Sequence, residues 1–115
     1  MARYTGLFKI ATSVGSLHQL LGELLESCNF NIVYQTGDYL MARETPGKVA
    51  YHKLVTVELL VDKSTATDKT IEMQMVIKNE ELPLQVDNHC RQIYMKVSQA
   101  IIDAHHWELI EAVAG

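Results

Sequence analysis

The segment TIEMQMVIKN, residues 70–79, alternates apolar and polar side chains along an extended chain. One side carries Ile71, Met73, Met75 and Ile77, and the other carries Glu72, Gln74 and Lys78. A strand of this kind has one face in a hydrophobic core and one in water, which is typical of antiparallel sheets. The pattern therefore predicts a sheet that is covered on one face only.

Further strands are predicted on both sides of this segment. Residues 4–10, YTGLFKI, show a weaker alternation and predict a first strand. The β-rich stretches FNIVYQ and DYLMAR flank Thr36-Gly37 and predict a hairpin, with one bent strand as the alternative. The sequence ETPGK is typical of a type II turn at Pro46-Gly47. The apolar run over residues 49–61 then predicts the central strand.

Two helices are predicted from apolar residues spaced three and four apart. The first begins near Ser16 or, one turn earlier, near Ser13, and its apolar stripe is Val14, Leu17, Leu20, Leu21, Leu24, Leu25 and Cys28. The second runs from about Asn88 to His105, with Cys90, Ile93, Tyr94, Val97 and Ile101 on one side. The closing WELIEAVAG either extends this helix or packs separately.

The predicted order of elements is strand, helix, four strands, helix. All strand connections are short enough for antiparallel pairing. We therefore expect one α+β domain over residues 1–115, in which a curved antiparallel sheet of four to five strands carries both helices on one face of a two-layer sandwich. The 48% hydrophobic content is sufficient for a core without disulfides or metals.

Charge and hydropathy exclude several classes of partner. The net charge is −4, and the ten Lys and Arg residues are scattered, so a nucleic acid is not an expected partner. No window reaches the roughly 18 apolar residues of a membrane span, and the first residues lack the apolar core of a secretory signal. We expect a cytoplasmic protein whose two cysteines remain thiols.

The stretch NEELPLQVDNHCRQIYMKV groups residues that resemble a catalytic site. Its simpler interpretation is a helix start, in which Pro83 ends the strand and Asp87 or Asn88 caps the helix. The alternative is a reactive Cys90 activated by His89. Adjacent helical residues point about 100° apart, so this geometry is poor, and both cysteines are predicted to be unreactive.

Two other pairs of polar residues are also assigned to structure. His105-His106 lacks the spacing of a metal site and is predicted to complement the helix dipole. Glu80-Glu81 is predicted to be a solvated strand edge. We therefore predict no catalytic residues, no cofactor and no metal.

One apolar pair points away from the predicted core. Met95 and Ile102 lie about 120 to 140° around the second helix from Cys90. Leu109 continues the seven-residue spacing, and these three residues form a candidate interaction surface. Either a second copy or the C-terminal tail, through Trp107 or Ile110, is expected to cover it.

The methionines suggest a second kind of site. A pocket between the sheet and the last helix would be lined by Met41, Met73, Met75 and Tyr94 and would bind a small apolar ligand. Methionine also fills gaps in ordinary cores, so the same residues can be purely structural.

The segments TGDYLMARE, KLVTVELLVD, KNEELPLQVDNHCRQ and WELIEAVAG resemble a family of small uncharacterised cyanobacterial proteins. The resemblance implies a cyanobacterial cytoplasm and gives no catalytic residues. We expect a non-enzymatic protein-interaction module or adaptor that forms a homodimer or larger homo-oligomer. The alternatives are a small apolar-ligand-binding protein and an enzyme whose site is not visible in the sequence.

Overall fold

The computed structural model describes residues 1–12, 14–62, 64, 66–67, 69–82, 88–104 and 107–114, without the side chains of residues 14–16. The helices and strands are β1 (Ala2–Ala11), α1 (Val14–Ser27), β2 (Phe30–Gln35), β3 (Tyr39–Glu44), β4 (Thr56–Asp62), β5 (Ile71–Asn79), α2 (His89–Asp103) and β6 (Glu108–Ala114).

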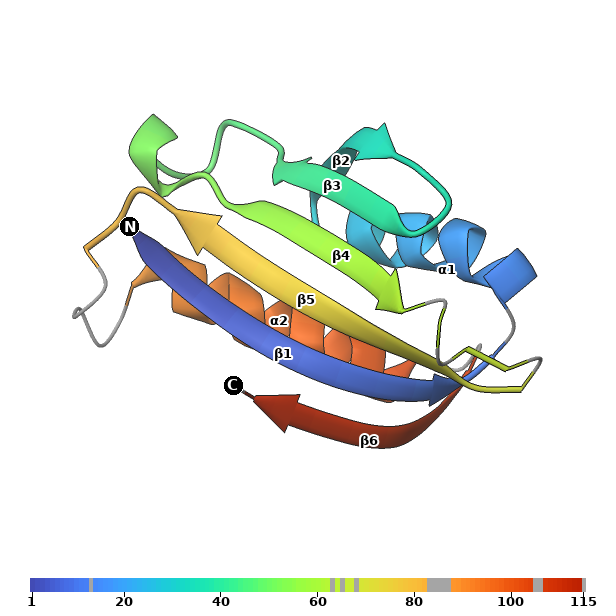
Figure 1. Cartoon of the computed structure of the whole chain (residues 1–115). Coiled ribbons are helices and arrows are strands. Elements are labelled where there is room, and N and C mark those ends of the chain that lie inside the picture. Colours follow the sequence, from blue (N-terminus) through green and yellow to red (C-terminus); the bar gives the residue numbers. More distant parts are fainter. Residues whose placement is uncertain are drawn as a thin grey trace.

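The strands form one antiparallel sheet in the order β2-β3-β4-β5-β1-β6, and both helices lie behind it (Figure 1). The predicted α+β fold with a curved sheet is therefore confirmed. We call the face without helices the open face. No helix in the described ranges has the length and apolar content to cross a membrane.

The sheet has six strands, which corrects the predicted four to five. The additional strand is β6, formed by the closing segment that was expected to extend the last helix or to pack separately. It pairs with the free edge of β1, where Leu109 lies beside Ile10 and Val113 beside Leu7. A register shift at Lys9/Ile10 breaks the alternation of β6, so the sequence did not show a regular strand pattern there.

Alternation in β1, β4 and β5 matches the prediction. The core between sheet and helices includes Phe8, Ile10, Val57, Leu59, Ile71, Met73, Met75 and Ile77. The predicted strand over residues 49–61 is too long, because a 3-10 helix at Tyr51–Lys53 interrupts it and β4 begins at Thr56. β4 is nevertheless central, since it lies between β3 and β5.

The connections around β2 and β3 are short turns. β2 and β3 form a hairpin, which removes the alternative of one bent strand. Asn29 has φ 73° and ends α1 in the left-handed conformation, and its carbonyl accepts a hydrogen bond from Thr45 N–H. Gly47 has φ 124°, a conformation that favours glycine at the predicted Pro46-Gly47 turn.

Both helices bury the predicted stripes. In α1 the buried leucines are Leu17, Leu21 and Leu25, and the helix begins at Val14, earlier than a start at Ser16. In α2 the buried residues are Cys90, Ile93, Val97 and Ile101. Tyr94 packs beneath β1, where its hydroxyl would be 2.9 Å from a Cβ on Gly6. Glycine at position 6 therefore allows α2 to approach the sheet closely.

Candidate functional site

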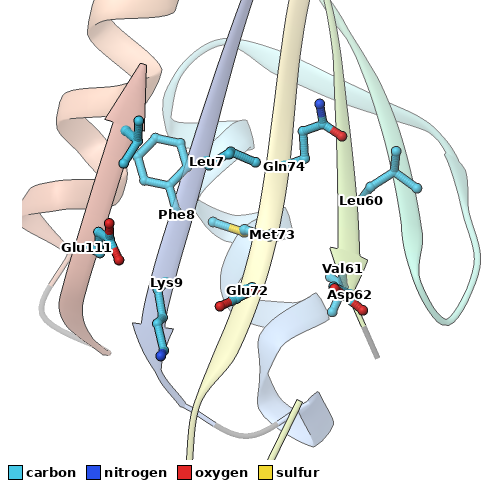
Figure 2. A pocket seen from close by; sticks show the side chains of 11 residues that line it. Leu7, Phe8, Lys9, Leu60, Val61, Asp62, Glu72, Met73, Gln74 and Glu111 are labelled. Atoms are coloured by element: carbon cyan, nitrogen blue, oxygen red, sulfur yellow. The ribbon is translucent and has the colours of Figure 1, made fainter. Parts of the chain in front are cut away.

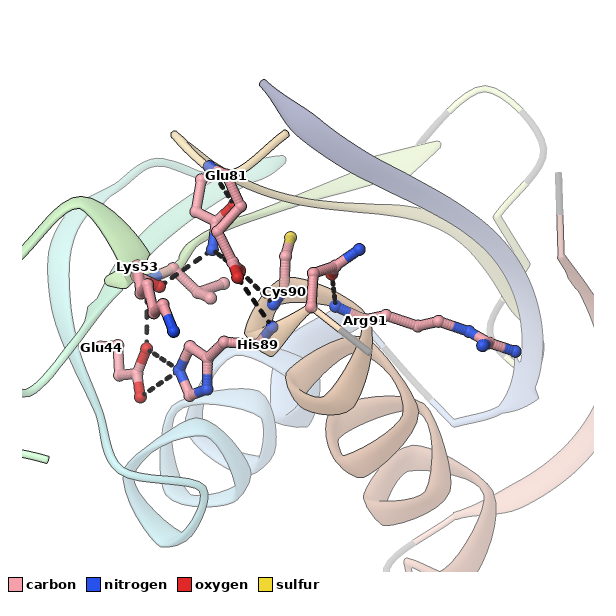
Figure 3. A network of polar contacts seen from close by, with 9 residues as sticks. Glu44, Lys53, Glu81, His89, Cys90 and Arg91 are labelled. Carbon is pink, nitrogen blue, oxygen red and sulfur yellow. Dashed lines mark hydrogen bonds and ion pairs between the residues drawn. The ribbon is translucent and has the colours of Figure 1, made fainter. Parts of the chain in front are cut away.

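The N-terminus of α2 lies in a network of polar contacts with the sheet (Figure 3). Asn88 is the N-cap, and its side-chain oxygen accepts a hydrogen bond from Arg91 N–H at 2.6 Å. Its amide donates to the Tyr4 hydroxyl at 2.8 Å, which ties the cap to β1. The predicted capping by Asn88 is confirmed, while Asp87 lies outside the described residues.

Glu81 is a second capping group for the same helix. Its carboxylate accepts hydrogen bonds from the N–H groups of His89 at 3.0 Å and Cys90 at 2.8 Å, and from the Asn79 side chain. Burial alone would raise the pKa of Glu81, but these hydrogen bonds outweigh it and the pKa is lowered. The prediction of a solvated Glu80-Glu81 edge is wrong for Glu81, which is 6% exposed, and holds for Glu80, which is exposed.

Glu44 and His89 form a buried pair that joins β3 to α2. The ring Nε2–H of His89 donates to the Glu44 carboxylate, at 2.8 Å from Oε1 and 2.9 Å from Oε2. Glu44 also accepts the N–H of Val55 at 3.1 Å. The side chains are 4% exposed for Glu44 and 15% for His89. Sequence reasoning missed Glu44, although it is in phase with the buried residues Leu40 and Ala42 of the same strand.

The polar groups of this network cap α2 and hold it to the sheet. Burial, followed by the negative charges of Glu81 and Glu44, raises the pKa of Cys90 to about 12, so its thiolate is not accessible near neutral pH. Cys28 and Cys90 are both buried and free. In the described part of the chain, no group of three or more His, Cys, Asp and Glu residues is placed to hold a metal ion. Pro83, His105 and His106 are outside that part.

The open face is the surface that the helices leave uncovered. Its side chains form four rows across the strands, because the pairing aligns outward residues of neighbouring strands. The rows are the acidic end (Lys9, Asp62, Glu72, Glu111), the apolar row (Leu7, Tyr39, Leu60, Gln74, Val113), the mixed row (Thr5, Met41, Glu58, Val76) and the basic end (Arg3, Arg43, Thr56, Lys78).

The three aliphatic side chains of the apolar row are exposed. Leu7, Leu60 and Val113 are 50%, 44% and 47% exposed. They line a groove of about 420 Å³ that also includes residues of the acidic end (Figure 2). The groove thus has aliphatic walls on one side and carboxylates on the other.

A polar cluster connects the mixed row to its neighbours. Glu58 accepts a hydrogen bond from the Tyr39 hydroxyl at 2.8 Å and lies 2.5 Å from the Lys78 ammonium group. Hydrogen bonding to Lys78 and then to Tyr39 lowers the pKa of Glu58. Burial and the Glu58 charge raise the pKa of Tyr39 to about 12. Glu58 therefore offsets part of the positive charge of the basic end, while Arg3 and Arg43 remain exposed.

The predicted interaction surface lies on two different elements. Met95 and Ile102 are on α2, with exposed fractions of 58% and 39%. Leu109 is on β6, half-buried against the core, so the seven-residue spacing does not place it on the same helix face. Trp107 is buried, and its ring N–H donates to the Ile101 carbonyl at 3.0 Å. The tail thus leaves the Met95 side chain exposed.

The four residues of the predicted pocket are not brought together. Met73 and Met75 are buried in the core, and Tyr94 is half-buried with its hydroxyl donating to the Thr5 carbonyl at 3.2 Å. Met41 is on the opposite side of the sheet, in the mixed row of the open face. The groove described above therefore lies on the other face from the predicted pocket, with Met73 at its floor.

Comparison of the chain with models of known protein families and with curated protein sequences gave no match. The candidate site is consequently identified by its geometry. Of the two regions, the network at α2 is buried and the open face is accessible, so the open face is the candidate functional site.

Proposed function

We propose that the protein is a non-enzymatic protein-interaction module that self-associates through the open face of its sheet. The observation that carries this proposal is the exposed apolar row, in which Leu7 on β1 is paired with Val113 on β6 and Leu60 lies two strands away on β4, across Gln74. An exposed apolar surface within a polar rim is characteristic of a protein-binding surface. Two-fold homodimers are the commonest soluble assemblies, so a second copy is the simplest partner.

The outer side of α2 is the competing surface. Met95 and Ile102 are exposed, but they are flanked by exposed polar residues such as Lys96 and Asp103. The open face offers more apolar side chains on a wide and regular platform. We therefore assign self-association to the open face and use the helix as the matched control.

A pair of double variants tests this assignment. Leu7→Lys with Leu60→Lys places two charges in the apolar row, and both positions are exposed enough to accept lysine without unfolding. We expect light scattering to report a dimer for the wild type and a folded monomer for this variant. The control, Met95→Lys with Ile102→Lys, should remain a dimer with an unchanged melting temperature. If the control becomes the monomer instead, the helix is the interface and the open-face assignment is wrong.

A second candidate function is the binding of a small amphipathic ligand in the open-face groove. The volume of about 420 Å³ lies within the range of small-molecule sites, roughly 300–1,000 Å³, and supports this alternative. Native mass spectrometry of protein purified from its source should then show a bound molecule, which the Leu7→Lys variant loses. Wild-type protein that carries no added mass would argue against a resident ligand.

We also propose a cytoplasmic location and a cyanobacterial source, as the sequence resemblance implies. The two buried free thiols are compatible with a reducing compartment. Cell fractionation with antibodies against the protein should place it with cytoplasmic markers, and recovery with extracellular or membrane markers would contradict the proposal.

A further inference from the structure

We infer that a second copy binds the open face with its strands antiparallel to those of the first, so that the acidic end of each copy covers the basic end of the other. This inference rests on the proposed self-association and specifies its symmetry. It is carried by the separation of charge along the strands. The acidic end has three carboxylates and one lysine, whereas the basic end has two arginines and Lys78, which is paired with Glu58 in the same copy.

Two orientations of the two-fold axis keep the strands aligned when two sheets are stacked face to face. An axis parallel to the strands would place each charged end on its own kind. An axis in the interface but perpendicular to the strands reverses the strand direction and places opposite ends together. Like charges in an interface are strongly unfavourable, so charge selects the perpendicular axis.

With the perpendicular axis, each strand lies over the same strand of the second copy, and the two strands cross within the usual angle of about 30° between packed sheets. On β5, Glu72 then lies over Lys78 of the second copy. On β6, Glu111 lies near Arg3 of the second copy. Lys9 also faces that arginine, which is a like-charged contact. Glu72 and Glu111 lie on either side of Lys9 and offset its charge. The mixed row lies over the apolar row.

The groove supports the same arrangement. Arginine and lysine side chains combine a long aliphatic stem with a cationic head. The groove combines Leu7, Leu60 and Val113 with the carboxylates of Asp62, Glu72 and Glu111. It therefore matches the basic side chains that the second copy would place above it.

The open face is also large enough for a specific dimer interface. The open face spans five adjacent strands, β3-β4-β5-β1-β6, which are about 4.8 Å apart, and its four rows are about 6.7 Å apart. Two such faces in contact would bury roughly 1,300 Å², at the lower part of the range for specific interfaces. A reversible dimer that depends on salt is expected from this area and charge.

Charge reversal at each end tests the arrangement. The acidic-end variant is Glu72→Lys with Glu111→Lys, and the basic-end variant is Arg3→Glu with Arg43→Glu. We expect each to weaken dimerisation by at least about 100-fold in Kd, measured by sedimentation equilibrium. The four changes on one chain should recover part of the lost affinity, because Glu111→Lys then lies near Arg3→Glu. Recovery is partial, since Glu72→Lys still faces the unchanged Lys78. Circular dichroism melting shows whether each variant is folded.

The acidic-end variant separates this arrangement from general repulsion. It removes the whole net charge of −4, so repulsion between two acidic proteins would predict a tighter dimer, whereas our arrangement predicts a weaker one. If the charge-reversal variant fails to fold, Glu72→Gln with Glu111→Gln serves instead and should also weaken the dimer. With an axis parallel to the strands, this neutral variant would strengthen it.

The outcomes distinguish the two proposals. A wild type that stays monomeric overturns self-association and with it the inference. The antiparallel arrangement alone is overturned if the acidic-end change leaves the Kd of the dimer unchanged or lowers it, or if the four-change chain dimerises no more tightly than either double variant. A dimer that is weakened by a change at either end and partly restored by both changes together supports the arrangement.

Discussion

Replacing His89 with Ala would leave the buried Glu44 carboxylate without its principal donor. Glu44 is 4% exposed, and His89 Nε2 lies within 2.9 Å of both of its carboxylate oxygens, so water cannot readily replace the ring. Breaking a buried pair by removing one partner costs about 3–5 kcal/mol. The Val55 N–H remains bonded to Glu44, and His89 is partly exposed, so we expect about 2–4 kcal/mol.

The loss should be visible in both denaturant and thermal unfolding. For a chain of this length it corresponds to a fall in melting temperature of roughly 8–16 °C. The matched control is the double variant His89→Leu with Glu44→Leu, which removes the unpaired charge and should recover part of the stability; the loss that remains includes the Val55 N–H left without its acceptor. If His89→Ala costs less than about 0.5 kcal/mol, as a surface substitution would, the pair does not anchor α2 to β3.

Four further predictions follow from the packing of α2. Gly6→Ala should destabilise the fold by about 1–3 kcal/mol, because the new methyl group meets the Tyr94 hydroxyl at 2.9 Å; the same change made in a Tyr94→Phe background should cost less, and an equal cost would exclude this contact as the cause. The lowered pKa of Glu81 means that its contribution to stability is present above the ordinary carboxyl pKa and is lost as the pH falls through the folded-state value. Glu81→Gln should therefore be less stable than the wild type at neutral pH and should lose less stability on acidification, and parallel acid-unfolding curves would contradict this role. Asn88→Ala should cost about 0.5–2 kcal/mol through loss of the cap, measured by urea unfolding, and an unchanged midpoint would mean that the cap is dispensable. Cys90, with its pKa raised to about 12, should react with a thiol reagent at pH 8 only as fast as the protein unfolds, and rapid labelling of the native protein would refute its burial.

Local periodicity was enough to predict most of the fold. The alternation in residues 71–77 fits only a strand, and the leucine stripe of residues 17–25 fits only a helix, because strands and helices place side chains with different periods. The last strand was not predicted, since its register shift breaks the alternation and no glycine or proline separates it from the preceding helix. Its place in the sheet depends on the free edge of β1, which exists only once the other strands have paired.

The candidate site was much less predictable. Glu44 and His89 are 45 residues apart in the sequence, and Glu81 is buried because the helix start folds back onto it. The charged ends of the open face likewise arise only when the strand order and register bring distant residues into rows. The exposure of Met95 and Ile102 could be predicted from the sequence, because the direction of a side chain around a helix depends only on local spacing. The open face could not be predicted in that way.

Sedimentation equilibrium of the wild-type protein at low salt, from micromolar to near-millimolar concentration, is the most direct test of self-association through the open face. We expect a reversible equilibrium between monomer and dimer that shifts to monomer on addition of salt and on substitution of Leu7 and Leu60 by Lys. A single monomeric species over the whole concentration range would contradict it.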